Sequence, residues 1–430
     1  MPHSSSPRRL LLGLAVIAAV TPAGTGQGRA EAQLLIEAST GKVLHAENAT
    51  YPWYPASVTK LMTTYTTLRA IKEGRLSMNT LLTVSRNAVA QQPTKMGFKL
   101  GTTVTVDNAL KMLMVKSAND MAVTIAEGVG GSIEGFADMM NANARRLGMT
   151  QSNFVNPNGL PAENHVTSAR DLGILARALI TEFPDYDYLW HIHAIQYGNR
   201  VMRNYNSLLD RYPGADGMKT GFICASGYNV VASATRNGRR LIAIVLGAWS
   251  GGARAQKAAQ WLERGVNGGG LSWLTPSLGT VDALAPVDAQ PPNLREEMCG
   301  GHRRKPPSEE NNEEEEEPTT SAAAGGENGA GDSNSNSAQA FMLSSLRPAN
   351  GKFVLGPAVE TEAPIKVFTG PADHPDPVQT ASAPPKKKKK KAVAATETKT
   401  NDAATETPAE KPAKKTAKKT AKPKVSSATQ

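Results

Sequence analysis

The sequence predicts an α+β fold in which one antiparallel sheet is assembled from both ends of a single folded region. A strand hairpin opens this region at residues 34–44, and a second hairpin closes it at residues 228–246. The pattern between them is mainly helical. Hairpins at both ends of a helical insertion are typical of an α+β protein and not of an alternating α/β fold.

Each hairpin is recognised from two apolar runs and the turn between them. The opening hairpin has Gly41 in its turn, and the closing hairpin has Asn237-Gly238, which between apolar runs is a strong hairpin signal. A further short strand is expected at residues 82–84. The two hairpins therefore supply most of the predicted sheet.

The helices expected between and after the hairpins follow from helical spacing of apolar residues and from their stop signals. The first is expected to end before Gly74, and the third of the middle helices at Gly148. The predicted helices cover residues 57–72, 109–115, 121–129, 133–147, 168–181 and 253–266. The helix at 109–115 has apolar residues on most faces and is therefore expected to be buried.

Residues 1–32 are predicted to be a secretory signal peptide. Arg8 and Arg9 precede an apolar stretch, residues 10–20, that is too short to span a membrane and remain there. Cleavage is expected within residues 23–32. The protein is therefore predicted to be exported to the periplasm or cell envelope, which is an oxidising compartment.

Two cysteines, Cys224 and Cys299, remain in the exported chain. A disulfide between them would tie residues 269–298 back against the folded domain. Alternatively, Cys224 is a small buried side chain and Cys299 is a free thiol. The sequence leaves both alternatives open.

Composition divides the rest of the chain. Fourteen lysines and four acidic residues follow Pro385, so this tail carries the whole net charge of +10. The preceding low-complexity segment cannot bury enough apolar area to offset its ordering entropy. The predicted organisation is a folded domain at 33–268, an extension at 269–302, a low-complexity linker at 303–385 with a short apolar island at 352–370, and a basic tail at 386–430.

The basic tail admits a nucleic-acid-binding interpretation, because its Lys/Ala/Pro composition is similar to that of histone tails. The signal peptide argues against this, because an exported tail meets anionic envelope polymers and lipid head groups first. We therefore expect no nucleic-acid partner, and we expect electrostatic contact of the tail with an anionic envelope surface.

A candidate nucleophile lies at the start of the first helix, in Pro55-Ala56-Ser57-Val58-Thr59-Lys60. Proline favours helix entry, and positions three apart share a helix face, which sets the Lys60 amine beside the Ser57 hydroxyl. This pairing suits an activated serine. The spacing alone is not decisive, because Ser39 and Lys42 repeat it in a hairpin turn, and an ordinary helix-capping serine is the alternative.

Two further motifs support the nucleophile. Ser117-Ala118-Asn119 follows in a loop between helices, and Lys219-Thr220-Gly221 immediately precedes the closing hairpin. This trio is found in β-lactamases and penicillin-binding proteins. Over residues 33–266 the sequence resembles the low-molecular-mass penicillin-binding proteins, which are serine-type D-alanyl-D-alanine carboxypeptidases. The match is close at residues 54–63 and 216–221.

The resemblance implies a β-lactamase/DD-peptidase-like fold, with a five-stranded antiparallel sheet flanked by helices, an all-helical lobe and an active site between the two. The catalytic residues it implies are Ser57 as nucleophile, Lys60 as base and Ser117 as proton relay. Asn119 would orient Lys60 and the substrate amide.

The resemblance also implies a substrate-binding strand. Lys219, as a nearby cation, would help to depress the pKa of Lys60. Lys219 and Thr220 would bind the free carboxylate of the substrate. Gly221 completes the motif, and the backbone N–H groups of Ser57 and Phe222 would form the oxyanion hole.

One departure from the family concerns the residues before Leu208. Relatives often have a basic residue between two asparagines there, whereas this chain reads Asn204-Tyr205-Asn206. If that basic residue helps to bind the carboxylate, Arg203 must substitute for it or the binding is weaker. Arg203 is not included in the predicted site.

The activity implied by the resemblance is removal of the terminal D-alanine from peptidoglycan stem peptides, with β-lactams as covalent inhibitors and no cofactor. No metal site is predicted, because no third ligand accompanies His191-Ile192-His193. A class A β-lactamase would add a Glu-x-x-Leu-Asn string between Ser117 and Lys219, and none is found. The complete set of motif residues argues against a non-catalytic wall-binding protein.

Overall fold

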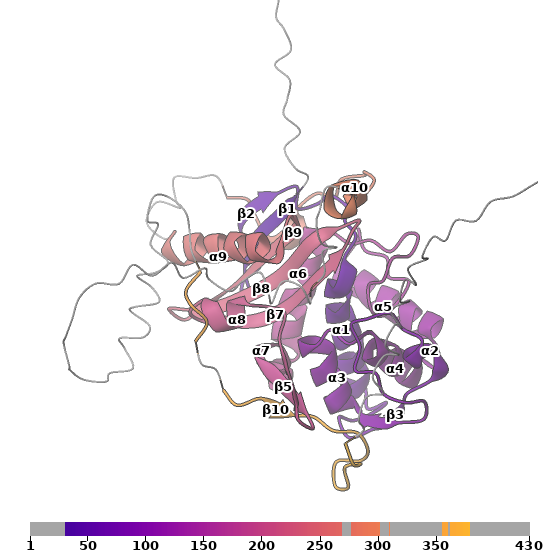
Figure 1. Ribbon diagram of the computed structural model, residues 1–430. Helices are drawn as coiled ribbons and strands as arrows, with labels where there is room; N and C mark the ends of the chain where they lie inside the picture. Colours follow the sequence, from indigo (N-terminus) through magenta and orange to yellow (C-terminus); the bar gives the residue numbers. More distant parts are fainter. Residues whose placement is uncertain (1–30, 269–276, 302–308, 310–354, 360–361, 379–430) are drawn as a thin grey trace, which may run out of the picture. The chain divides into compact units, whose positions relative to one another are not determined.

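The computed structural model describes residues 31–268, 277–301, 309, 355–359 and 362–378 of the chain (Figure 1). These residues belong to one compact unit that ends at Ala381. The predicted basic tail, nearly all of the predicted signal peptide and most of the predicted linker lie outside the described residues. Among the described residues, no helix is long and apolar enough to cross a membrane.

The centre of the fold is a five-stranded antiparallel sheet with the strand order β2-β1-β9-β8-β7. Its strands are β1 (Ala32–Glu37), β2 (Val43–Glu47), β7 (Ala215–Ile223), β8 (Gly227–Arg236) and β9 (Arg239–Ala248). The opening hairpin joins the closing one through antiparallel pairing of β1 with β9, in which Leu34 lies opposite Ile244. This confirms the predicted sheet assembled from both ends, and it places β7 at an edge.

Helices cover both faces of this sheet (Figure 1). The helix α9 (Gly251–Asn267) packs on β8 and β9, and α6 (Ala169–Glu182) packs on β1 and β9. Successive side chains of a strand point to opposite faces. Accordingly, Leu34 and Ile36 lie against α6, whereas Leu35 lies against α9. Burial on both faces explains why Leu34, Leu35 and Ile36 form a continuous apolar run and do not alternate with polar residues.

The second lobe is helical and lies on the β7 side of the sheet (Figure 1). Its elements are η1 (Ala56–Thr59), α1 (Lys60–Lys72), α2 (Arg86–Val89), α3 (Val106–Val115), α4 (Asn119–Gly130), α5 (Ile133–Leu147) and the two-stranded sheet of β3 (Leu81–Thr83) with β4 (Thr103–Thr105). The first predicted helix begins as a 3₁₀ turn, so Ser57 lies in η1 and the α-helix proper begins at Lys60. The predicted burial of α3 is confirmed.

Helix α1 is buried on nearly all sides although it is rich in threonine. The Thr64 hydroxyl donates a hydrogen bond of 2.9 Å to the carbonyl of Lys60, and the Thr67 hydroxyl one of 2.8 Å to the carbonyl of Thr63. Bonds to the preceding turn satisfy a threonine hydroxyl within the helix itself. The helix can therefore be buried without unpaired polar groups at these positions, and it holds Lys60 in a rigid core.

Several short elements were not predicted. They are η2 (Pro184–Tyr186), α7 (Tyr188–His191), β5 (Ala194–Tyr197), β6 (Arg200–Arg203), α8 (Leu208–Arg211), η4 (Val281–Ala283), α10 (Arg295–Cys299) and β10 (Ile365–Lys366). Each has five residues or fewer, which is too short for apolar periodicity to reveal it.

The extension after the last long helix returns to the sheet. Cys224 and Cys299 form a disulfide with a Cα–Cα distance of 5.6 Å, which decides between the two alternatives that the sequence left open. The Leu294 amide also donates a hydrogen bond of 3.0 Å to the carbonyl of Ala225. The short helix α10 is thereby held against the end of β7.

The described part of the apolar island also docks on the folded body. Leu355 and Val367 are buried, and β10 pairs with β5 in parallel. The Val359 amide donates to the carbonyl of Asp210, and the Gly370 amide to the carbonyl of Thr103. This segment, yellow in Figure 1, therefore contacts both α8 and the end of β4.

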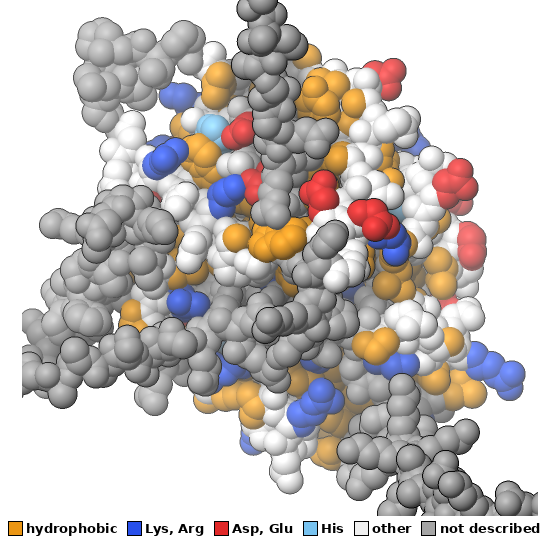
Figure 2. Space-filling model, turned by 45° about the horizontal axis from the view of Figure 1, so that its top comes forward, with side chains coloured by type: hydrophobic (Ala, Val, Ile, Leu, Met, Phe, Trp, Pro, Cys, Tyr) orange, Lys and Arg blue, Asp and Glu red, His pale blue; other side chains and the backbone are white. Residues whose placement is uncertain are grey.

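Charge on the described surface is mixed. Figure 2 shows Lys and Arg side chains interspersed with Asp and Glu side chains on the face seen there. This agrees with the sequence, because residues 1–385 carry no net charge.

Candidate active site

The Ser57 hydroxyl and the Lys60 amine lie together at the junction of the two lobes. Lys60 Nζ is 2.8 Å from Ser57 Oγ. The 3₁₀ turn brings them together because residues three apart eclipse each other there. Ala56, just before Ser57, has a left-handed φ of 51°. Strained backbone of this kind is concentrated at functional sites and is maintained by the surrounding packing.

Lys60 is fully buried, and its amine has two further partners. Nζ donates 2.8 Å hydrogen bonds to the Asn119 side-chain oxygen and to the carbonyl of Asn158. Burial, and secondly the positive charge of Lys219, hold the pKa of Lys60 well below its usual range. In the neutral state, with these two hydrogen bonds retained, the amine presents its lone pair to the Ser57 hydroxyl.

The Ser117-Ala118-Asn119 motif enters the site from the loop between α3 and α4. Asn119 is fixed at both ends of its amide, because its nitrogen donates a 3.0 Å hydrogen bond to the carbonyl of Gln92. Ser117 has a left-handed φ of 57° and is buried. Its hydroxyl has no hydrogen-bond partner among the described residues. A buried polar group without a partner calls for an explanation, and a ligand that completes the site provides one.

Strand β7 forms the opposite wall, directly against η1. A Cβ atom on Gly221 would lie 2.7 Å from the Ser57 nitrogen and 3.0 Å from the Val58 nitrogen. A residue without a side chain is therefore required for this approach. The next residue, Phe222, stacks on Tyr228 of β8 with ring centroids 4.3 Å apart.

Lys219 and Thr220 are both buried. Lys219 Nζ donates a 3.1 Å hydrogen bond to the carbonyl of Thr220. Burial lowers the pKa of Lys219 to about 7, with Arg254 lowering it further and Glu309 raising it. The site therefore contains two buried amines with lowered pKa values, which is typical of catalytic sites.

Two further residues position the turn η1. The Asn229 side chain of β8 donates 3.1 Å hydrogen bonds to the carbonyls of Tyr54 and Pro55, and so ties the entry of η1 to the sheet. His165 lies 2.9 Å through Nε2 from Thr59 Oγ1. Burial lowers the pKa of His165 to about 4, so its ring is neutral near pH 7.

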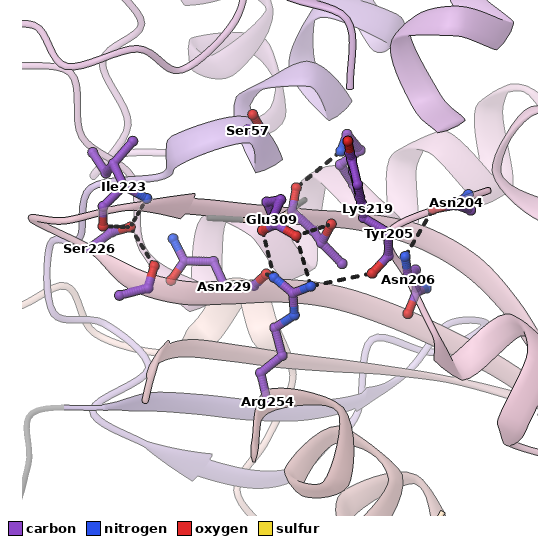
Figure 3. A network of polar contacts seen from close by, with 12 residues as sticks. Ser57, Asn204, Tyr205, Asn206, Lys219, Ile223, Ser226, Asn229, Arg254 and Glu309 are labelled. Atoms are coloured by element: carbon purple, nitrogen blue, oxygen red, sulfur yellow. Dashed lines mark hydrogen bonds and ion pairs between the residues drawn. The ribbon is translucent and has the colours of Figure 1, made fainter. Parts of the chain in front are cut away.

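A carboxylate is held in the site by Arg254, a residue of α9 that the sequence did not indicate. The Arg254 guanidinium is 4% exposed and binds the Glu309 carboxylate through two hydrogen bonds, of 2.7 and 2.9 Å. Thr220 Oγ1 donates a third, of 3.3 Å. Figure 3 shows Glu309 beside Lys219, between Arg254 and Ser57. A bidentate arginine with a hydroxyl is a strong carboxylate-binding arrangement.

Arg203, considered as a substitute for the missing basic residue, does not reach this carboxylate. Its side chain is 64% exposed and lies 3.9 Å from Asp210. Tyr205, at the position where relatives have the basic residue, instead accepts a 3.3 Å hydrogen bond from Arg254 through its backbone carbonyl. Among the described residues, the arginine that binds this carboxylate is therefore Arg254, and the Tyr205 carbonyl helps to orient it.

The region that contains this site also matches known protein sequences. The sequence model of the D-alanyl-D-alanine carboxypeptidase family matches residues 18–250, more than half of the chain. The chain is 36% identical over 243 residues to the D-alanyl-D-alanine carboxypeptidase DacD of Salmonella typhimurium, and 36% identical over 226 residues to DacF of Bacillus subtilis. These matches cover 55% and 51% of this chain, and only 62% and 57% of the relatives.

Solved structures share the fold. The chain is similar to the D-alanyl-D-alanine carboxypeptidase DacD of Francisella tularensis, with a TM-score of 0.54 and 28% identity, over 61% of this chain and 74% of that one. It is similar to penicillin binding protein 6B of Escherichia coli, with a TM-score of 0.52 and 34% identity, over 55% and 76% of the two chains. The matched region contains Ser57, Lys60, Ser117 and Lys219, and the chain belongs to the D-alanyl-D-alanine carboxypeptidase family.

Proposed function

We propose that the protein is a serine-type D-alanyl-D-alanine carboxypeptidase that removes the terminal D-alanine from peptidoglycan stem peptides. The observation that carries this proposal is the combination of a buried amine 2.8 Å from Ser57 Oγ with a buried carboxylate-binding group close by. A nucleophile beside a carboxylate site suits cleavage next to a free C-terminus. The substrate of an endopeptidase has no terminal carboxylate next to the cleaved bond, so such an enzyme does not need this group.

Acylation begins when neutral Lys60 takes the Ser57 proton as Oγ attacks the carbonyl carbon of the penultimate D-alanine. The negative charge that develops on the carbonyl oxygen is stabilised by the N–H groups of Ser57 and Phe222. One such donor is typically worth about 2.7–4 kcal/mol. The close approach of β7 to Ser57 at Gly221 supports this pairing of donors.

The proton must next reach the leaving amine. Ser117 passes it from Lys60 to the nitrogen of the terminal D-alanine, the C–N bond breaks, and D-alanine leaves. Water then hydrolyses the ester on Ser57. The Ser117 hydroxyl is buried and has no hydrogen-bond partner in the part of the chain that the structure describes, which supports its assignment as this relay.

The terminal carboxylate of the substrate binds Arg254 and Thr220, next to the cationic Lys219. The Glu309 carboxylate on Arg254 and Thr220 supports this placement, because it has the same chemistry as the C-terminus of a peptide. β-Lactams carry a carboxylate too, and they acylate the same serine. Relatives include proteins named for penicillin binding, such as penicillin binding protein 5 of Haemophilus influenzae.

The substrate also defines the compartment. Peptidoglycan lies outside the cytoplasmic membrane, so we infer that the protein is exported and acts in the periplasm or cell envelope. The predicted signal peptide supports export. The basic tail is inferred to bind an anionic envelope surface.

Substitution of the nucleophile tests the proposal. We expect Ser57→Ala to abolish both D-alanine release from a peptide ending in D-Ala-D-Ala and covalent labelling by a fluorescent penicillin. Ser39→Ala is the matched control, because Ser39 belongs to the other Ser-x-x-Lys sequence, in a hairpin turn. It should leave both measurements unchanged. Release or labelling near the wild-type level in Ser57→Ala would refute the assignment.

A further inference from the structure

Glu309, an acidic residue of the protein itself, lies where the proposed function places the carboxylate of the substrate. Glu309 lies in the acidic, low-complexity part of the sequence, 55 residues beyond Arg254. Its side chain is nevertheless only 11% exposed, because both carboxylate oxygens bind Arg254. An isolated glutamate from such a segment is normally solvated.

The contacts of Glu309 leave no room for a second carboxylate. Glu309 occupies the bidentate edge formed by Nη1 and Nη2 of Arg254, with hydrogen bonds of 2.7 and 2.9 Å. Thr220 Oγ1 donates to the same carboxylate. The same two terminal nitrogens of Arg254 also donate to the carbonyls of Asn229 and Tyr205, at 3.4 and 3.3 Å. Binding of Glu309 to Arg254, as drawn in Figure 3, and binding of a substrate C-terminus to the same edge are therefore mutually exclusive.

Glu309 is also tethered close to the site. Cys299 is bonded to Cys224, which directly follows β7, and Glu309 lies only ten positions beyond Cys299 in the sequence. Ten residues reach at most about 36 Å when fully extended. A ligand on a short tether has an effective concentration in the millimolar range. The disulfide therefore keeps this carboxylate available to the site at all times.

We propose that Glu309 is an intramolecular competitor, which occupies the carboxylate-binding group of Arg254 and Thr220 until a substrate carboxylate displaces it. The protein is then autoinhibited by its own Glu309 side chain. Peptides and β-lactams must compete with Glu309, so only the fraction of molecules in which Glu309 has left the site can bind them.

The charges around the nucleophile agree with this. The Glu309 carboxylate raises the pKa values of Lys60 and Lys219, opposing the effect of their burial. An arriving substrate carboxylate replaces Glu309 near Lys219, so the charge of that region is preserved during turnover.

The inference rests on the proposed function, and the experiment separates the two. Full-length wild type, Glu309→Gln and Glu309→Ala are compared by their second-order rate constants of acylation with a fluorescent penicillin, and by kcat and KM for D-alanine release. If about one tenth of wild-type molecules are free of Glu309, both variants acylate about tenfold faster. KM should fall by the same factor, and kcat should stay unchanged, because saturating substrate displaces Glu309 from wild type as well.

Glu310→Gln is the control, because it removes the same charge from the adjacent position and should behave as wild type. Glu309→Asp keeps the carboxylate and should remain nearer to wild type than Glu309→Ala. Unchanged or slower acylation in both Glu309→Gln and Glu309→Ala would overturn the autoinhibition, and slower acylation would indicate that Glu309 merely supports Arg254. If wild type and all variants fail to form a covalent adduct, it is the proposed function that fails.

Discussion

At the scale of single residues, Lys60 shows how the surroundings determine chemistry. A lysine in water is protonated near neutral pH and cannot accept the proton of a serine. Lys60 is fully buried, and Lys219 adds a second positive charge nearby. Both effects disfavour the ammonium form, so the pKa of Lys60 lies well below its usual range. The proposed role of Lys60 as a base therefore depends on its burial more than on the motif spacing.

The lowered pKa values of Lys60 and Lys219 predict a bell-shaped pH profile for kcat/KM. Activity rises with pH as Lys60 loses its proton and becomes a base. It falls again above about pH 7, because Lys219, whose pKa is about 7, loses the positive charge that attracts the substrate carboxylate. Lys219→Arg keeps that charge at high pH and should abolish the alkaline fall.

The profile is measured as kcat/KM for D-alanine release between pH 5 and pH 10. Lys42→Arg, which changes an exposed lysine in the opening hairpin, is the control and should keep both limbs. An alkaline limb that persists in an active Lys219→Arg enzyme would show that another group titrates there.

At the scale of elements, the site depends on how closely β7 approaches η1. The Asn229 side chain anchors the entry of η1 to the sheet, and Gly221 lets the two backbones meet. A second glycine, Gly159, allows a similarly close contact with η1 from another segment. A Cβ atom on Gly159 would lie 1.8 Å from the carbonyl oxygen of Ala56. The backbones of η1, β7 and the loop at Gly159 therefore come into direct contact around Ser57.

Gly221→Ala should separate β7 from Ser57. The added methyl group meets the Ser57 and Val58 nitrogens at 2.7 and 3.0 Å, which is closer than a Cβ atom tolerates. We expect penicillin acylation to slow by about 10²-fold or more, the typical effect of losing one oxyanion donor. Gly301→Ala, which meets no atom within 4 Å, is the control and should acylate normally. Normal acylation by Gly221→Ala would mean that β7 is not part of the oxyanion hole.

The disulfide between Cys224 and Cys299 is predicted to stabilise the folded domain. It closes a loop of 75 residues, which on the chain-entropy model is worth about 4 kcal/mol. We expect the double variant Cys224→Ser/Cys299→Ser to lower the free energy of unfolding by about this amount, measured by urea denaturation. Wild type under reducing conditions should show the same loss. Two free thiols in denatured, unreduced wild type would contradict the prediction.

At the scale of the whole molecule, charge and catalysis are separated along the chain. The tail after Pro385 carries the net charge of +10, and the preceding residues carry none. Almost no large apolar residue accompanies its lysines, so an inserting amphipathic anchor is not expected. Each lysine near an anionic membrane contributes about 1 kcal/mol of attraction. We therefore propose that the tail is a salt-sensitive electrostatic tether.

Truncation after Pro385 tests the tether. The shortened protein should bind anionic vesicles and peptidoglycan more weakly than the full chain at low salt, and it should release D-alanine from a soluble peptide at the same rate. A full-length variant with Lys386–Lys391 changed to glutamine should lose part of the binding. Equal binding of all three proteins, or full-length binding that persists at high salt, would rule the tether out.

The sequence by itself determined the architecture of the sheet and the motif residues. Its two hairpins, its long helices and the order of Ser57, Ser117 and Lys219 are local signals, because apolar periodicity, turn glycines and short motifs are properties of neighbouring residues. The five-stranded sheet and the buried α3 agree with these signals. The chemical roles of the motif residues remain predictions for the variants above to test.

Only the tertiary structure decided the contacts between distant residues. Arg254 meets a carboxylate 55 positions away, and Cys224 bonds to Cys299 across 75 positions. Apolar periodicity relates only residues that are near each other in the sequence. The sequence around a helical arginine does not show which distant residue its side chain contacts. The lowered pKa of Lys60 likewise requires burial by several segments at once. These properties arise from packing, which brings residues together irrespective of their distance along the chain.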